Sequence, residues 1–73
     1  MHFYAIEFET ASEAIQHVNA SGRGAAILFH SRNLVVTQAD ANLLAGRGIE
    51  FAYLGDHEMP DGTWRIVTVP VND

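Results

Sequence analysis

Four polar residues separate two apolar runs in the segment AILFHSRNLVV, residues 26–36: His30, Ser31, Arg32 and Asn33. These residue types could form a catalytic site with His30 as general base, Ser31 as nucleophile and Arg32 as anion clamp. However, neighbouring residues on a strand point to opposite faces, and the sequence supplies no third group to orient the base or stabilise an oxyanion.

The same four residues suit the turn of a β-hairpin. Asn33 tolerates the left-handed backbone conformation, and Ser31 can hydrogen-bond its own backbone. We therefore expect a turn of about four residues between the two apolar runs. Because loop tips on rigid scaffolds often carry function, His30, Ser31, Arg32 and Asn33 remain candidate binding residues, with Arg32 able to pair with a carboxylate or phosphate.

A second polar cluster occurs in the segment GDHEMPDG, residues 55–62, which contains Asp56, His57, Glu58 and Asp61. Such side chains can bind a divalent metal. Alternation along an extended segment lets at most Asp56 and Glu58 converge, and no His pair with the spacing of a zinc site is present. We expect a solvated hairpin tip with no metal or other cofactor, and retain Asp56 and His57 as candidate binding residues.

The tripeptide Gly-Arg-Gly occurs twice, at residues 22–24 and 46–48. A phosphate-binding loop lies between a strand and the start of a helix, whereas both tripeptides follow an expected helix and precede a strand. Helix C-capping accounts for the glycines. Arg23 and Arg47 suit the negative ends of the helices and could also line one edge of the sheet.

Composition limits the classes of function. The chain has 73 residues, a net charge of −5 and no cysteine, which excludes disulfides and thiolate zinc sites. A single domain over residues 1–73 is the ceiling for this length. No membrane span or signal peptide is evident, so we expect a cytoplasmic protein. The negative charge disfavours nucleic acid, although Tyr4, Phe51, Tyr53 and Trp64 could otherwise stack on bases.

Hydrophobic periodicity and turn signals predict the element order βαββαββ. Thr10 with Glu13 and Thr37 with Asp40 mark the starts of the two helices. We expect strands at residues 1–8, 25–29, 34–37, 49–59 and 63–71. We expect helices at residues 10–22 and 37–48. Residues 10–29 and 37–54 share the order cap, helix, Gly-Arg-Gly, strand, which either internal duplication or chance similarity explains.

This order predicts a two-layer α+β domain with a ferredoxin-like split β-α-β arrangement and a C-terminal strand added at the sheet edge. Two short helices would cover one face of the sheet, yet most strands are apolar on both faces. A second copy covering the other face is the simplest solution, so we expect a homodimer. Strand ends and the C-terminal segment folding over that face are the alternative.

The residues show no family resemblance. The pattern favours a small non-enzymatic binding or regulatory module that acts as a homodimer and takes a small molecule or another protein. The alternative is a small enzyme with a pocket between subunits, in which His30 or His57 acts as acid or base. A convergent polar set in a pocket is typical of an enzyme, and its absence favours a binding module.

Overall fold

The computed structural model describes residues 4–71. It contains two helices and five strands in the expected order. These elements are β1 (Ile6–Phe8), α1 (Ala11–Ser21), β2 (Ala25–Phe29), β3 (Arg32–Val36), α2 (Gln38–Gly46), β4 (Phe51–Glu58) and β5 (Trp64–Val71). Neither helix within the described residues is long and apolar enough to cross a membrane.

The five strands form one antiparallel sheet in the order β1-β3-β2-β4-β5. Two split β-α-β units interlock in it, because β3 lies between β1 and β2 while β2 lies between β3 and β4. The last strand lies at the sheet edge, as the sequence predicts. The opposite edge is β1, which pairs with β3 from Ile6, opposite Val35, to Phe8, opposite Asn33.

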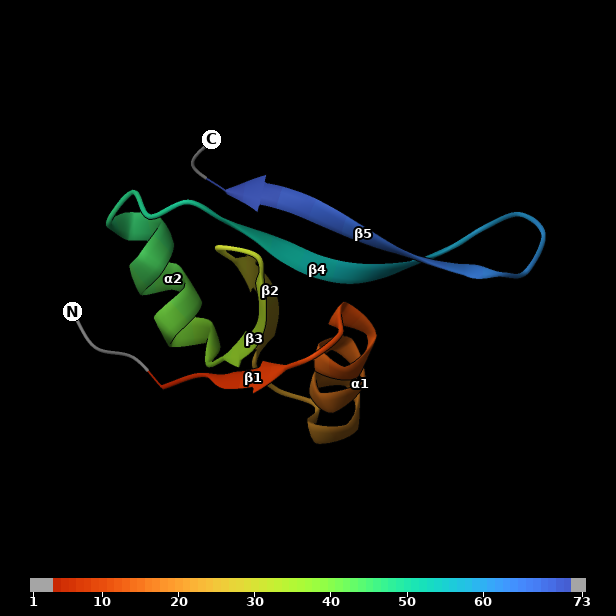
Figure 1. Cartoon of the computed structure of the whole chain (residues 1–73), viewed down its shortest axis with the longest axis horizontal. Helices are drawn as coiled ribbons and strands as arrows, with labels where there is room; N and C mark the ends of the chain where they lie inside the picture. The colour runs from red at the N-terminus through yellow and green to blue at the C-terminus, as the bar shows by residue number, and fades with distance from the viewer. Residues whose placement is uncertain (1–3, 72–73) are drawn as a thin grey trace.

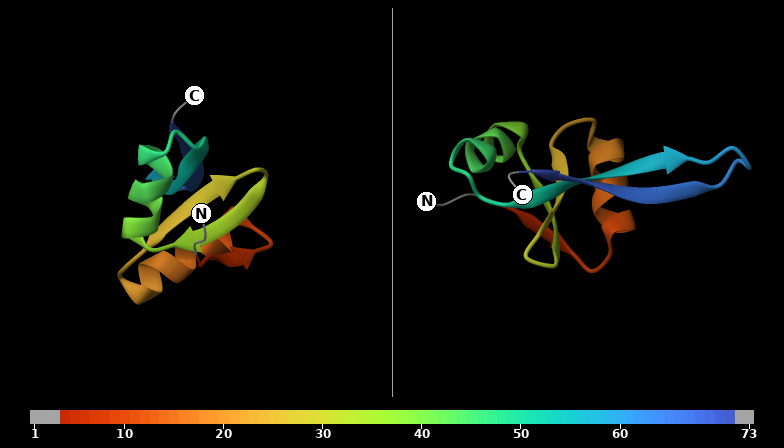
Figure 2. Two further views of the ribbon diagram at one scale, coloured as in Figure 1. Left: turned by 90° about the vertical axis from the view of Figure 1, so that its left-hand side faces the viewer. Right: turned by 90° about the horizontal axis from the view of Figure 1, so that it is seen from above.

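The two helices pack on opposite faces of the sheet (Figures 1 and 2), where α1 and α2 flank the β2–β3 pair from opposite sides. Successive side chains of β2 point to opposite faces of the sheet, so this strand contacts both helices. Ile27 faces α2 in a core that includes Leu44, and both side chains are fully buried. The neighbouring Ala26 faces α1 in a second core with Ile15. The β2–β3 pair is therefore covered on both faces by the chain itself.

This arrangement corrects the expectation of two layers, and the ferredoxin-like arrangement is not confirmed. A ferredoxin-like sheet has its first and third strands in the middle, whereas here β4 joins β2 instead of β1. The crossover from β1 to β2 and the crossover from β3 to β4 therefore run in the same direction across the sheet. Their starting strands, β1 and β3, are antiparallel to each other. Two crossovers of the same hand must in that case place their helices on opposite faces.

The helix starts follow the sequence signals. Thr10 Oγ1 accepts a hydrogen bond from the Glu13 backbone N–H at 3.2 Å and donates one to Glu13 Oε1 at 3.0 Å. Thr37 Oγ1 accepts from the Asp40 N–H at 3.1 Å. Each threonine thus satisfies a backbone donor that the first helical turn leaves without a partner.

The two Gly-Arg-Gly segments end their helices in different ways. After α1, Gly22 adopts a left-handed conformation (φ 72°), and its N–H donates to the Val18 carbonyl at 2.9 Å. After α2, the left-handed residue is Gly48, and the paired bonds from Gly48 to Ala45 and from Ile49 to Leu44 form a Schellman motif. Helix C-capping is confirmed for both segments.

The turn between β2 and β3 is tighter than the expected four residues. Phe29 pairs with Arg32, so His30 and Ser31 alone form the loop. Both have positive φ, 48° and 65°, which is the pattern of a type I′ turn. Asn33, which the sequence suggested for the left-handed position, lies instead within β3 and pairs with Leu28.

Strands β4 and β5 form a long hairpin whose tip extends away from the rest of the domain (Figure 1). Its turn contains the expected Pro-Asp-Gly sequence. The Gly62 N–H donates to the Met59 carbonyl at 2.9 Å, and Gly62 has a φ of 87°. Pro60 presets the backbone of the first turn position, and glycine accepts the left-handed one.

The strained type I′ turn generates the first prediction. The double variant His30→Asn with Ser31→Gly should raise the free energy of unfolding by about 1 kcal/mol, because Asn-Gly suits two positive φ angles. Denaturant unfolding followed by circular dichroism measures the change. The matched control places the same two residue types in reverse order, His30→Gly with Ser31→Asn, and should stabilise less. No stabilisation by Asn-Gly would contradict the type I′ assignment.

Candidate functional site

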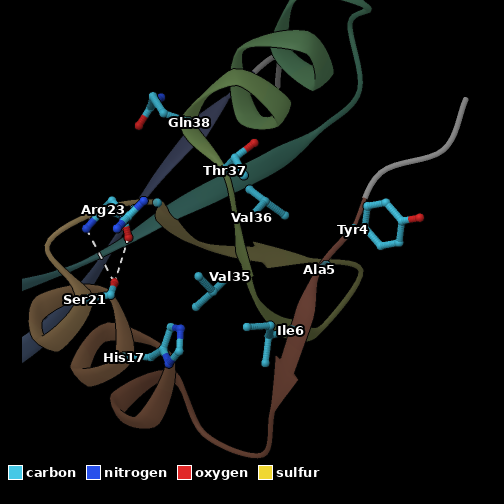
Figure 3. A pocket seen from close by; sticks show the side chains of 11 residues that line it. Tyr4, Ala5, Ile6, His17, Ser21, Arg23, Val35, Val36, Thr37 and Gln38 are labelled. Carbon is cyan, nitrogen blue, oxygen red and sulfur yellow. Dashed lines mark hydrogen bonds between the residues drawn. The ribbon is translucent and has the colours of Figure 1, made fainter.

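A cleft of about 700 Å³ lies at the β1 edge of the sheet, between α1 and the junction of β3 with α2 (Figure 3). It exists because the two strands part. Pairing of β1 with β3 begins at Ile6, opposite Val35, so the preceding Tyr4 and Ala5 are unpaired while β3 continues through Val36. The space that this leaves beside the end of β3, bounded on its other side by α1 and the α1–β2 loop, is the cleft.

The cleft combines an apolar floor with polar walls. Ile6 and Val35 are cross-strand partners at its base, and the His17 side chain points toward them from α1 in Figure 3. Its ring also packs against Phe8, with the ring centroids 5.4 Å apart. The complete lining consists of Tyr4, Ala5, Ile6, His17, Ser21, Arg23, Gly24, Val35, Val36, Thr37 and Gln38.

Gly24 allows the cleft wall to approach β3 closely. A Cβ at this position would lie 3.0 Å from the Val36 carbonyl oxygen, and the φ of Gly24 is 93°. Any side chain here would meet backbone rather than a flexible group, and its backbone conformation would be strained. The glycine therefore fixes the path from α1 into β2 and places Arg23 at the cleft.

Three polar side chains of the lining are already engaged within the protein. Ser21 Oγ bonds to the carbonyls of Val18 and Arg23, at 3.3 and 3.0 Å. Thr37 caps α2, and Gln38 Nε2 donates to Asn42 Oδ1 at 3.1 Å. These groups hold the loop and the helix start in place, so they shape the cleft.

Two cleft side chains, those of Arg23 and His17, have no hydrogen-bond acceptor among residues 4–71. The only ion pair in that part of the chain joins Arg32 to Glu7, which leaves the Arg23 guanidinium without a carboxylate. Asp and Glu do not occur in the lining. The cleft thus presents cation and N–H donors in a chain whose net charge is −5.

The structure places the predicted turn residues apart from this cleft. His30 and Ser31 form the exposed tip of the β2–β3 hairpin, where the His30 ring packs edge-on against Phe29 at 4.3 Å. Arg32 Nε lies 3.5 Å from Glu7 Oε2, and Asn33 Nδ2 donates to the Glu9 carbonyl at 3.3 Å. Arg32 and Asn33 therefore tie β3 to β1 and its end, and no convergent site forms.

Asp56 and His57 are exposed on β4 and point to opposite faces of the hairpin. Asp56 lies opposite Ile66 beside a smaller cleft of about 440 Å³, which Trp64 also lines. His57 lies opposite Arg65. Across residues 4–71, no three His, Asp or Glu side chains gather closely enough to hold a metal ion.

Sequence reasoning did not assign His17, Arg23 or Gln38 to a site. His17 is one of several exposed polar residues on an amphipathic helix, and Arg23 is explained by its capping motif. The signal that could have found them is structural. The cleft is visible only once it is known that β1 stops pairing with β3 at Ile6. Residues from three segments distant in sequence then surround the same space.

Comparisons with known proteins returned no match. No family model fits the chain, and neither a curated protein nor a solved structure is significantly similar to it.

The hairpin tip gives a pH-dependent prediction. Thr63 donates to Asp61 Oδ1 from its hydroxyl at 2.6 Å and from its backbone N–H at 3.0 Å, and these bonds lower the pKa of Asp61 below its ordinary value of 3.8. A lowered folded-state pKa means that the contribution of Asp61 to stability is present above pH 3.8 and is lost as the pH falls through the folded value. We expect the Thr63 amide to lose its protection from hydrogen exchange in that acid range.

Exchange of the Thr63 amide, measured by NMR as the pH is lowered, tests this expectation once the intrinsic pH dependence of exchange is subtracted. Asp61→Asn is the control, because its side chain does not titrate and the Thr63 protection factor should then be independent of pH. An equal acid-induced loss of protection in that variant would contradict the role of the Asp61 carboxylate.

Proposed function

We propose that the protein is a non-enzymatic binding module that acts as a homodimer, joined through the edge of β5. One observation carries the proposal. Strand β5 exposes four large apolar side chains at the edge of the sheet: Trp64 (65% exposed), Ile66 (41%), Val67 (37%) and Val69 (58%). Exposed apolar groups concentrated on one edge strand are typical of an association surface.

An uncovered sheet face does not support the dimer, since the helices cover opposite faces of the β2–β3 pair. The edge of β5 supports the same assembly for a different reason. Its outer edge pairs with no strand among residues 4–71. Arg65 is the only charged residue in β5, and Pro70 blocks the edge only near the strand's end. Protected edges usually carry more charges, a bulge or a covering segment.

A second copy suits this edge better than an arbitrary peptide. Two β5 strands related by a two-fold axis run antiparallel, which is the arrangement of every pair in this sheet. When the pair is centred on Val67, this valine lies beside its own copy, Ile66 lies beside Thr68, and Val69 lies beside Arg65 of the second copy. The stretch from Trp64 to Val69 would extend the sheet without placing like charges directly opposite each other when it is centred on Val67.

The enzyme alternative lacks support in the geometry. His30 and His57 are exposed and line neither cleft. Within residues 4–71, neither imidazole forms an ion pair or a hydrogen bond with a carboxylate. A general base needs both a substrate pocket and an orienting partner, so these histidines do not favour catalysis.

Sedimentation equilibrium from micromolar to millimolar concentration tests the dimer. We expect the wild-type mass to approach twice the 8.0 kDa of one chain. Val69→Lys should shift the protein to the monomer, because in the register centred on Val67 the ammonium group would lie opposite Arg65 of the second copy. Leu43→Lys is the matched control, since Leu43 is also exposed (41%) but lies on α2. A monomeric wild type at every concentration would refute the proposed assembly.

A charge at Phe51 and a charge at Val67 should have different effects. Phe51 is 5% exposed and belongs to the α2 core, so Phe51→Asp should unfold the chain. Val67 is 37% exposed at the edge, so Val67→Asp should leave a folded monomer. Circular dichroism combined with sedimentation distinguishes these outcomes. Unfolding by Val67→Asp would instead assign Val67 to the core.

A further inference from the structure

We propose that the cleft at the β1 edge binds small amphipathic carboxylates, with Arg23 and His17 meeting the carboxylate and the Ile6–Val35 floor receiving the apolar body. The proposal goes beyond the homodimer and does not depend on it. Strands β1 and β5 form opposite edges of the sheet, so association through β5 leaves the cleft open.

The size of the cleft suits a small molecule. Its volume of about 700 Å³ lies within the usual range for small-molecule sites. Most such sites are apolar, with a few polar groups that orient the ligand. Here the backbone of β3, the C-terminal half of α1 and the start of α2 are each fixed by hydrogen bonds, so these three walls are formed without a ligand, whereas Tyr4 on the remaining side is 94% exposed.

The charge of the ligand follows from the groups that lack partners. A guanidinium binds carboxylates through parallel N–H donors, and an imidazole can add another donor. The absence of Asp and Glu from the lining removes the groups that would repel an anion or neutralise Arg23. This matters in a chain that contains only four basic residues and nine acidic ones.

The second cleft lacks this combination. It contains Asp56 and Trp64 but no Arg or His, so a carboxylate would meet a like charge there. An anionic ligand therefore distinguishes the two clefts. An uncharged apolar ligand would not distinguish them, because both clefts contain apolar side chains.

The experiment uses 4-phenylbutyrate and its uncharged analogue 4-phenylbutanol as probes, added to the ¹⁵N-labelled full chain and followed by NMR. We expect 4-phenylbutyrate to shift the amide signals of Ile6, Arg23 and Gly24 in a saturable way. 4-Phenylbutanol should bind more weakly at the same residues. Because Arg23 is exposed, Arg23→Gln should weaken 4-phenylbutyrate binding about three- to fivefold and leave 4-phenylbutanol unchanged.

Arg47→Gln is the matched control. It makes the same substitution in the second Gly-Arg-Gly segment, changes the net charge equally and lies outside the cleft. His17→Phe keeps the ring contact with Phe8 and removes the donors, so it should weaken carboxylate binding by a smaller factor. An unchanged amide spectrum outside the substituted residue shows in each case that the variant is folded.

Three results would overturn the proposal. The first is the absence of saturable shifts with 4-phenylbutyrate. The second is that both probes bind equally well and that Arg23→Gln changes neither affinity. The cleft would then bind ligands through apolar contacts alone. The third is a shift pattern confined to Asp56, Trp64 and their neighbours, which would place the ligand in the other cleft. Each result leaves the sedimentation test of the homodimer unaffected.

Discussion

Burial of the β2–β3 pair on both faces is the constraint on which the rest of this structure depends. Ile27 and Leu44 are fully buried on the α2 side, and Ala14 is fully buried on the α1 side. Since side chains of a strand alternate between faces, a slip of one residue between β2 and β3 would exchange the contents of the two cores. The two-residue turn at His30 and Ser31 fixes that register at a conformational cost.

The same central pair determines where the surfaces for binding can lie. Its faces are covered by helices, so the accessible surfaces are the sheet's two outer edges, the spaces beside them and the β4–β5 hairpin, which extends past the helices. At one edge, β1 is three residues long and leaves the end of β3 unpaired on that side, which opens the cleft. At the other edge, β4 and β5 are eight residues each and extend past the helices, which exposes β5. The short strand β1 thus produces the concave cleft at one edge, and the long strand β5 produces the extended exposed surface at the other.

Local signals in the sequence were sufficient for the order of the elements, but not for the length of the β2–β3 turn, where β3 begins at Arg32 instead of Leu34, nor for the assembly of the sheet. Threonine caps, glycine after each helix and Pro-Asp-Gly in the hairpin act within a few residues, and each was found where the sequence predicts it. The choice between pairing β4 with β1 or with β2 is a long-range decision that periodicity does not encode. Once β4 pairs with β2, the handedness of the crossovers places the helices on opposite faces. Apolar residues on both faces of β2 and β3 then pack against the two helices, so they no longer require a second copy to cover them.

The candidate site was missed for the same reason. His30, Ser31, Arg32 and Asn33 attracted attention because they are adjacent in sequence, and adjacency on a hairpin disperses side chains. His17, Arg23 and the Ile6–Val35 pair come from separate elements and meet because β1 ends early. A chain of this length buries only about 60% of its unfolded surface, so little of it can be spared from the core. Of its four arginines, Arg32 is paired with Glu7, Arg47 follows α2 and Arg65 lies on the hairpin, which leaves Arg23 as the cation that lines an apolar cleft.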